Sequence, residues 1–287
     1  MNDFDRLRAT LLDLARALQH DAIPLIIGGG FGLYLKQEHV QQSGARTLLE
    51  LPLPRSTNDI DLFLRLDVLI RLDAMQKVAK ALDTLGFQVL ENARYFQWQR
   101  ELTGGHQVKL DLLTGPLGDF RKQLKTDKAP RVRPKGDLKL HAHQTDEAIE
   151  VDSRSKSITI VGECTDGTKH SIQILLPHAF TYLIMKLFAF DDRKNDASKN
   201  VGRHHAMDLY RIVAMMTEAE YGEVMELSKA YGGDSRVKRA RSIVASDFDK
   251  PTSLGLLRLR EHELFADHFK TDKFIEVLAE VFAAGTA

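Results

Sequence analysis

Apolar positions recur with two different periods along this chain. Near the N-terminus, Leu7, Leu11, Leu14 and Leu18 lie three or four residues apart, which predicts an amphipathic helix that ends before Pro24. From residue 25 to about 175, short apolar or alternating runs predict strands, and after Pro177 the helical period returns and continues to the end. The pattern predicts an α+β protein with a mixed sheet in the N-terminal half and a helical C-terminal half.

The individual elements follow from these runs and from the Gly, Pro and Asn residues between them. The predicted strands are 25–27, 59–64, 87–90, 95–100, 107–113, 157–162 and 169–175. Besides the first helix, the predicted helices are 31–36, 67–85, 178–191, 203–216, 218–230, 235–245 and 273–284. Residues 37–58 are polar and contain Gly44, Pro52 and Pro54, so they predict a long loop. A domain boundary is expected near residue 176, which gives an α/β domain (1–176) and a helical domain (177–287).

Composition narrows the class without naming a function. The 287 residues include 40 basic and 40 acidic side chains, so the net charge gives no global argument for a nucleic-acid partner. Residues 121–139 have a local excess of basic residues and are a candidate polyanion surface. The single cysteine, Cys164, excludes a disulfide within the chain, and no apolar run approaches the roughly 20 residues of a membrane span. We expect a cytoplasmic protein that does not insert into a membrane.

The run from Asp59 to Leu64 carries the most chemical information. Strand side chains alternate, so Asp59 and Asp61 share one face while Ile60, Leu62 and Leu64 point into a core. Two neighbouring carboxylates repel each other unless a cation lies between them, and hard oxygen ligands suit Mg²⁺ or Mn²⁺. The alternative interpretation is an edge strand whose two aspartates are simply solvated.

Two further features favour the metal interpretation. In the later strand 107–113, Asp111 lies opposite the face of Val108, Leu110 and Leu112, which repeats the arrangement of an acid above an apolar face. Three carboxylates are what a two-metal phosphoryl-transfer site requires. Upstream, Gly28, Gly29 and Gly30 lie at a predicted strand-to-helix turn, where backbone N–H groups are exposed and suited to phosphate binding.

At this point the chain resembles a family. The motifs are Ile27-Gly28-Gly29-Gly30, then Arg55-Ser56-Thr57-Asn58-Asp59-Ile60-Asp61-Leu62, then Lys109-Leu110-Asp111. They resemble those of the DNA polymerase β-like nucleotidyltransferase superfamily and, within it, the AbiEii/AbiGii-type toxins of type IV toxin–antitoxin systems. The resemblance extends over roughly residues 25–214 and implies a nucleotidyltransferase fold. It also implies a lysine, an arginine and an aspartate in the helical half, and Lys186, Arg193 and Asp208 fit those places.

The resemblance implies a role for each matching residue. Metal binding falls to Asp59, Asp61 and Asp111, which with Lys186 and Asp208 form the implied catalytic set; nucleotide binding falls to Gly28, Gly29, Gly30, Arg55, Thr57, Lys186 and Arg193. Two positions depart from the family pattern. Gly30 replaces the usual Ser or Thr, and His205 replaces an acidic residue. The loop before Asp59 is also longer than usual.

Lys186 lies in an apolar segment, because nearly all its neighbours between Phe180 and Phe190 are apolar. A cation there must reach solvent or meet an anion. Arg193 follows seven residues later on the same helical face, so both side chains are candidates to grip the β- and γ-phosphates. The alternative is a lysine that extends to the surface and an arginine that interacts with the helix dipole.

The histidines are given structural roles. His204, His205 and Asp208 have helical spacing, but adjacent histidines point about 100° apart on a helix and do not share an ion. His141 and His143 alternate on a possible strand, without a third metal ligand nearby in the sequence.

The leading hypothesis is a metal-dependent enzyme that transfers a nucleoside monophosphate from an NTP to an acceptor hydroxyl. The resemblance implies a toxin with a cognate antitoxin protein, and a tRNA 3′ end or a protein as the acceptor. The alternatives are a nucleotidyltransferase that modifies a small molecule such as an antibiotic, a metal-dependent glycosyltransferase, and an inactive binding module that has kept the fold.

Overall fold

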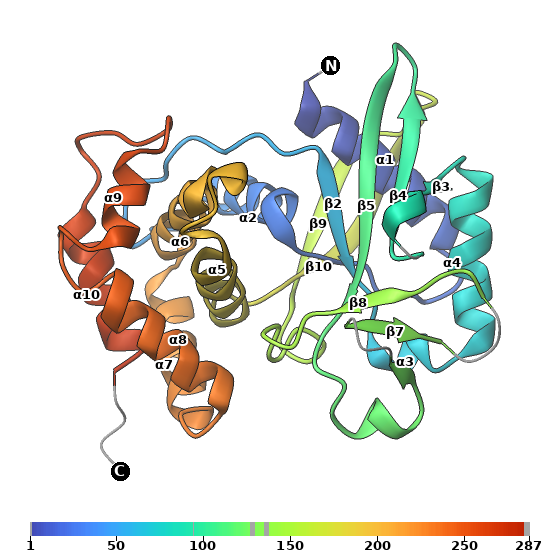
Figure 1. Cartoon of the computed structure of the whole chain (residues 1–287). Helices are drawn as coiled ribbons and strands as arrows, with labels where there is room; N and C mark the ends of the chain where they lie inside the picture. The colour runs from blue at the N-terminus through green and yellow to red at the C-terminus, as the bar shows by residue number, and fades with distance from the viewer. Residues whose placement is uncertain (1, 94, 127–129, 135–137, 284–287) are drawn as a thin grey trace. The chain divides into compact units, whose positions relative to one another are not determined.

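The structure is a computed structural model that describes all residues except 1, 94, 127–129, 135–137 and 284–287. It confirms the predicted fold class, with a mixed sheet in the N-terminal half and helices in the C-terminal half. The chain forms two compact units (Figure 1). We call Met1–Gly32 with Ser56–His178 the sheet unit, and Leu33–Arg55 with Ala179–Ala287 the helical unit.

One mixed sheet forms the centre of the sheet unit. Its strands follow the order β6-β7-β8-β5-β2-β1-β10-β9, and β4 also pairs with β5 and carries β3. β2 is parallel to β5 and antiparallel to β1. The strands are β1 (Ile26–Ile27), β2 (Asp59–Phe63), β3 (Gln88–Val89), β4 (Gln97–Leu102), β5 (His106–Thr114), β6 (Lys125–Thr126), β7 (Arg131–Arg133), β8 (Ala142–Gln144), β9 (Lys156–Glu163) and β10 (Lys169–Leu176).

The first helix of the chain, α1 (Asp3–Leu18), begins with a capping box. The Asn2 side chain accepts from the Asp5 N–H, and the Asp5 carboxylate accepts from the Asn2 N–H. The predicted leucine stripe is buried, and it packs α1 against β2, β5, β9, β10 and α4. Because α1 occupies one side of the sheet, the apolar residues of β2 and β5 are buried there.

The remaining helices confirm most of the predicted pattern. The predicted helix over 67–85 is divided into two, and the sequence did not predict α9. The helices are α2 (Gly29–Ser43), α3 (Leu66–Leu69), α4 (Leu72–Thr84), α5 (Ala179–Arg193), α6 (Arg203–Met215), α7 (Glu218–Ala230), α8 (Ser235–Asp247), α9 (Leu254–Arg260) and α10 (Thr271–Val281), with short 3₁₀ turns η1 (Glu91–Ala93), η2 (Gly118–Lys122) and η3 (Ala197–Gly202).

Residues 37–58 correct the predicted long loop, because α2 continues through Ser43. Two polar residues of this helix are buried by partners far along the chain. Lys36 donates to Glu220 (2.6 Å), and the Gln37 amide donates to the carbonyl oxygen of Pro52 (2.6 Å). These bonds, together with the backbone bond from Leu48 N–H to the Met216 oxygen (2.8 Å), hold residues 33–55 in the helical unit. The domains 1–176 and 177–287 remain a prediction, and the compact units additionally group 33–55 with the C-terminal helices.

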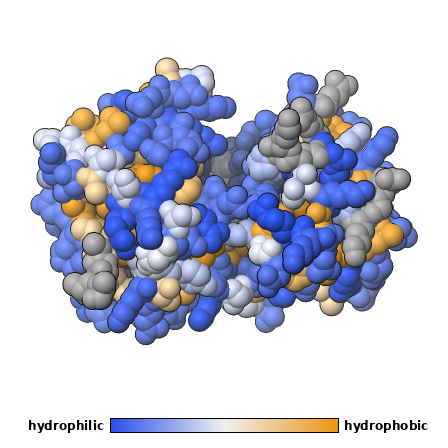
Figure 2. All heavy atoms as spheres, turned by 60° about the horizontal axis from the view of Figure 1, so that its bottom comes forward, coloured by the Kyte–Doolittle hydropathy of each residue, from blue (hydrophilic) through white to orange (hydrophobic). Residues whose placement is uncertain are grey.

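The surface is mainly polar. On the face drawn in Figure 2, hydrophobic residues are scattered among hydrophilic ones. The large apolar side chains that are exposed come from separate segments of the chain: Leu53, Leu72, Val161 and Leu257. None of the helices in the described ranges combines the length and apolarity that crossing a bilayer requires.

Candidate active site

The predicted carboxylates lie side by side in the sheet unit. β2 and β5 pair in parallel with Asp61 opposite Asp111 and Asp59 opposite Lys109. The residues next to these aspartates are fully buried, namely Ile60 and Leu62 on β2 and Leu110 and Leu112 on β5, whereas the three aspartates are only partly buried. Paired residues of neighbouring strands point to the same side of a sheet. Asp59, Asp61 and Asp111 therefore share the face of the sheet opposite its apolar side.

Two of these carboxylates accept a hydrogen bond from a neighbouring side chain. The Thr57 hydroxyl donates to Asp59, and the Gln97 amide donates to Asp111 (3.1 Å) from the paired position on β4. Sequence reasoning missed Gln97, because only the pairing of β4 with β5 shows that it faces Asp111. Burial raises the pKa of the Asp111 carboxyl, and the Asp59 charge raises it further, whereas Gln97 and Lys109 oppose the rise.

The glycine turn contacts the same face. Gly28 donates its backbone N–H to the Asp61 carbonyl oxygen (2.8 Å), and Gly29 has a φ of 60°. A Cβ atom at Gly29 would lie 1.6 Å from Oδ2 of Asp61, and one at Gly28 would lie 2.6 Å from the Phe63 ring. At Gly29 both the backbone conformation and the space exclude a side chain, and at Gly28 the Phe63 ring leaves too little space for one. The beginning of α2 is thus brought against the Asp61 carboxylate.

These residues suit a hard divalent cation in type and in their position on the sheet. Carboxylate oxygens are the ligands that Mg²⁺ prefers, and all three aspartates share one face. Among the described residues, however, no three His, Cys, Asp or Glu side chains are gathered closely enough to hold a metal ion as they stand.

Lys186, Arg193 and Asp208 lie in the helical unit. Asp208 on α6 is completely buried and meets three cations: Lys186 on α5 at 2.8 Å, Arg211 at 3.3 Å and Arg55 at 3.5 Å. Burial by itself would raise the pKa of the Asp208 carboxyl, but Lys186, Arg55 and Arg211 hold it well below its usual range. Lys186 is therefore a buried ion-pair partner and not a lysine that extends to solvent. Sequence reasoning missed Arg211, which also donates to Gln37.

Arg193 meets a neutral partner. Its guanidinium donates to Nε2 of His205, and burial, followed by the charge of Lys186, holds the pKa of His205 well below its ordinary value. His205 is therefore uncharged and able to accept. Within the described contacts, Arg193 pairs with no carboxylate. Lys186 and Arg211, the two cations nearest to Asp208, are buried, whereas Arg193 is exposed.

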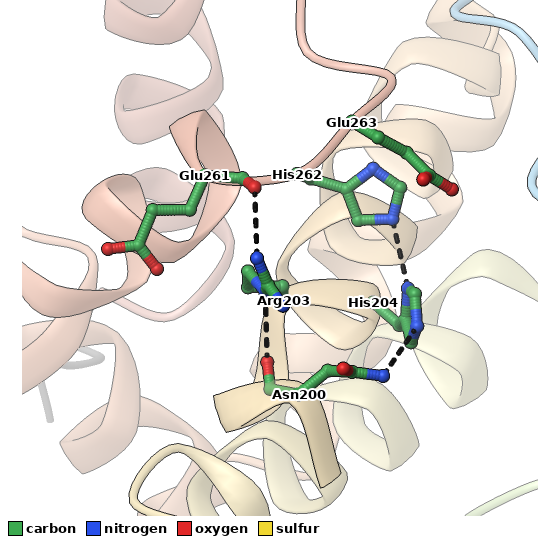
Figure 3. A pocket seen from close by; sticks show the side chains of 6 residues that line it. All are labelled: Asn200, Arg203, His204, Glu261, His262 and Glu263. Atoms are coloured by element: carbon green, nitrogen blue, oxygen red, sulfur yellow. Dashed lines mark hydrogen bonds between the residues drawn. The ribbon is translucent and has the colours of Figure 1, made fainter. Parts of the chain in front are cut away.

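A pocket of about 390 Å³ in the helical unit was not predicted (Figure 3). His204 on α6 and His262 after α9 both line it and contact each other, with Nδ1 of His204 3.0 Å from Nε2 of His262. The Leu264 N–H donates to Nδ1 of His262 (3.1 Å), so the proton of that ring lies on Nε2 and is donated to His204. A protonated nitrogen does not ligate a metal, and this histidine pair is a structural link between the two segments.

Comparison with known proteins gives no relative, so the assignment of a function depends on the geometry of the site. No protein-family model matches the chain, and neither the curated proteins nor the solved structures contain a significant match to it.

Proposed function

We propose that the protein is a metal-dependent nucleotidyltransferase. The observation that carries the proposal is the group of Asp59, Asp61 and Asp111 on one open face of paired strands, beside the Gly28–Gly30 turn. Burial, and after it the charge of Asp59, raises the pKa of Asp111, and a divalent cation beside the carboxylates removes the cost of their negative charge. The start of α2 beside the carboxylates is a helix N-terminus, which suits the triphosphate that such a cation accompanies.

The proposed reaction assigns a task to each group. Asp59, Asp61 and Asp111 would hold Mg²⁺ or Mn²⁺, and such ions, when bound, neutralise the charge that develops on the phosphates. At the start of α2, the backbone N–H groups that follow Gly28 bind phosphate oxygens. The acceptor hydroxyl oxygen attacks the α-phosphorus, and its proton passes to Asp111. The bond from that phosphorus to the α–β bridging oxygen breaks, and pyrophosphate leaves with the bonding electrons.

The cations of the helical unit support a phosphate-binding role for Lys186 and Arg193. Within the described contacts, the exposed Arg193 meets a neutral imidazole and no carboxylate, so its guanidinium can pair with an anionic substrate such as an NTP. Lys186 lies seven residues earlier on the same helix, α5. The resemblance further leads us to propose a toxin that is neutralised by a cognate antitoxin, with tRNA or a protein as the acceptor.

The test is to incubate the purified protein with each labelled NTP, Mg²⁺ and either total tRNA or cell lysate. Transfer of label from an NTP to a macromolecule is expected, with its loss in Asp61→Asn. Asp119→Asn is the matched control, because Asp119 is exposed in η2, away from β2 and β5. Label that appears only on an added aminoglycoside favours the small-molecule alternative, and turnover of a nucleotide sugar instead of an NTP favours the glycosyltransferase. Full transfer by Asp61→Asn contradicts the proposal.

A further inference from the structure

The open face of the sheet continues beyond the aspartates onto β8. β8 is parallel to β5, and its His143 pairs with Leu113, two residues beyond Asp111 on the same strand. Residues two apart on a strand share a face, and so do paired residues. Burial agrees, because Ala142 and Gln144 are buried on either side of the half-buried His143. His143 therefore lies on the face of the three aspartates, roughly 8 Å from Asp111 between Cα atoms by strand spacing.

The surroundings of His143 leave its polar atoms available. Neither imidazole nitrogen makes a hydrogen bond to any other residue that the structure describes. The ring instead packs against Phe96, with the ring centroids 5.2 Å apart. Burial lowers the pKa of His143, so the imidazole is neutral at pH 7 and offers both a donor and an acceptor.

The glycine turn and β8 lie on opposite sides of Asp111. Gly28 and Gly29 contact Asp61 on β2, whereas β8 borders β5 on its other edge, in line with β4. A triphosphate at the turn therefore leaves the β8 side of Asp111 free for the second substrate. In a transfer reaction the acceptor hydroxyl must lie next to the group that takes its proton.

We propose that the acceptor binds over β8 and that the His143 imidazole forms a hydrogen bond with it beside Asp111. This inference rests on the proposed nucleotidyl transfer and deepens it, because it locates the second substrate. His143 holds the acceptor, while Asp111 takes the proton. Loss of the His143 imidazole should therefore weaken binding of the acceptor and leave NTP binding intact.

The experiment compares His143→Ala and His143→Gln with the wild type, using total tRNA as the acceptor probe. Transfer from each labelled NTP is measured over a range of tRNA concentrations, and NTP binding is measured separately as the rise in melting temperature with Mg²⁺ and no acceptor. We expect His143→Ala to lower transfer at limiting tRNA at least tenfold while keeping the NTP-induced rise. His143→Gln, which retains a donor and an acceptor, should recover part of the loss. His106→Ala is the control, because His106 is an exposed histidine at the start of β5, the strand that carries Asp111.

The outcomes separate this inference from the proposed function. Full transfer by His143→Ala at every tRNA concentration, in a preparation whose wild type is active, overturns the acceptor site alone. A variant that loses transfer together with the NTP-induced rise also overturns it, because the residue would then support the fold or the nucleotide. A wild type that transfers no nucleotide to tRNA or to lysate overturns the proposed function, and the acceptor site with it.

Discussion

Removing either partner of the Lys186–Asp208 pair should destabilise the helical unit, and by unequal amounts. Lys186→Met keeps an apolar stem and deletes one charge-assisted bond of 2.8 Å, while Arg211 and Arg55 remain at 3.3 and 3.5 Å from Asp208. A hydrogen bond to a charged group contributes about 1.5–3 kcal/mol, so we expect a loss of about 2 kcal/mol. Asp208→Asn leaves three cations without their carboxylate, and such an uncompensated buried charge costs about 3–5 kcal/mol.

The assay is urea denaturation followed by two signals. Far-UV circular dichroism reports mainly the helices, whereas the fluorescence of Trp98, the single tryptophan, reports the sheet unit through β4. Both variants should lower the midpoint of the circular-dichroism transition without changing its slope. Lys273→Met is the matched control, since the Lys273–Glu276 pair is about half exposed and should contribute less than about 1 kcal/mol.

The order of the two losses tests the reasoning. If Asp208→Asn costs no more than Lys186→Met, the three cations do not depend on this carboxylate. If both cost less than about 1 kcal/mol, the pair is not a structural one. The double variant Lys186→Met/Asp208→Asn should cost less than the sum of the single losses, because the remaining partner is no longer left behind.

Three further outcomes are expected. Asp61→Asn and Asp111→Asn should abolish transfer while leaving the Trp98 denaturation midpoint equal or higher, because each removes carboxylate repulsion; a clearly lower midpoint would argue for a structural role. Gly29→Ala should destabilise the sheet unit by more than about 2 kcal/mol, whereas Gly86→Ala, with a φ of 75° but open space around it, should cost only about 1 kcal/mol in the same titration. Burial, aided by His204, lowers the pKa of His262 to about 4, below the unfolded value of 6.5, so this residue's contribution to stability is complete above pH 6.5 and is lost as the pH falls towards 4. The free energy of unfolding should therefore fall less between pH 7 and pH 5 in His262→Gln than in the wild type. An equal fall in both proteins would refute this.

Local patterns predicted the parts of the candidate site that depend on strand periodicity. Alternation along Asp59-Ile60-Asp61-Leu62 and along the strand of Asp111 separates acids from a buried face, and the structure has this separation. The glycine turn was also recognisable from a local pattern, because glycine is required where a positive φ and a close approach coincide, as they do at Gly29. The roles in metal and nucleotide binding remain predictions until transfer is measured.

Contacts between distant segments could not be predicted from the sequence. The end of α2 was predicted to be a loop because residues 37–58 are polar and contain Gly44, Pro52 and Pro54, but the carbonyl oxygen of Pro52 accepts from the buried Gln37 amide. Lys186 was not assigned to Asp208, since nothing in the sequence shows which anion meets a buried lysine 22 residues away. Propensity and period describe a residue's own segment, whereas such partners depend on how segments pack.

The sequence by itself determined the fold class, the first helix and the face on which each aspartate lies, because period and chain geometry are local properties. The tertiary structure alone decided the order of the strands. That order places both Gln97 on β4 and His143 on β8 next to β5, the strand of Asp111, although these residues come from separate parts of the chain. Strand order depends on which edges bury the most apolar surface once the sheet forms, and that quantity belongs to the folded chain as a whole.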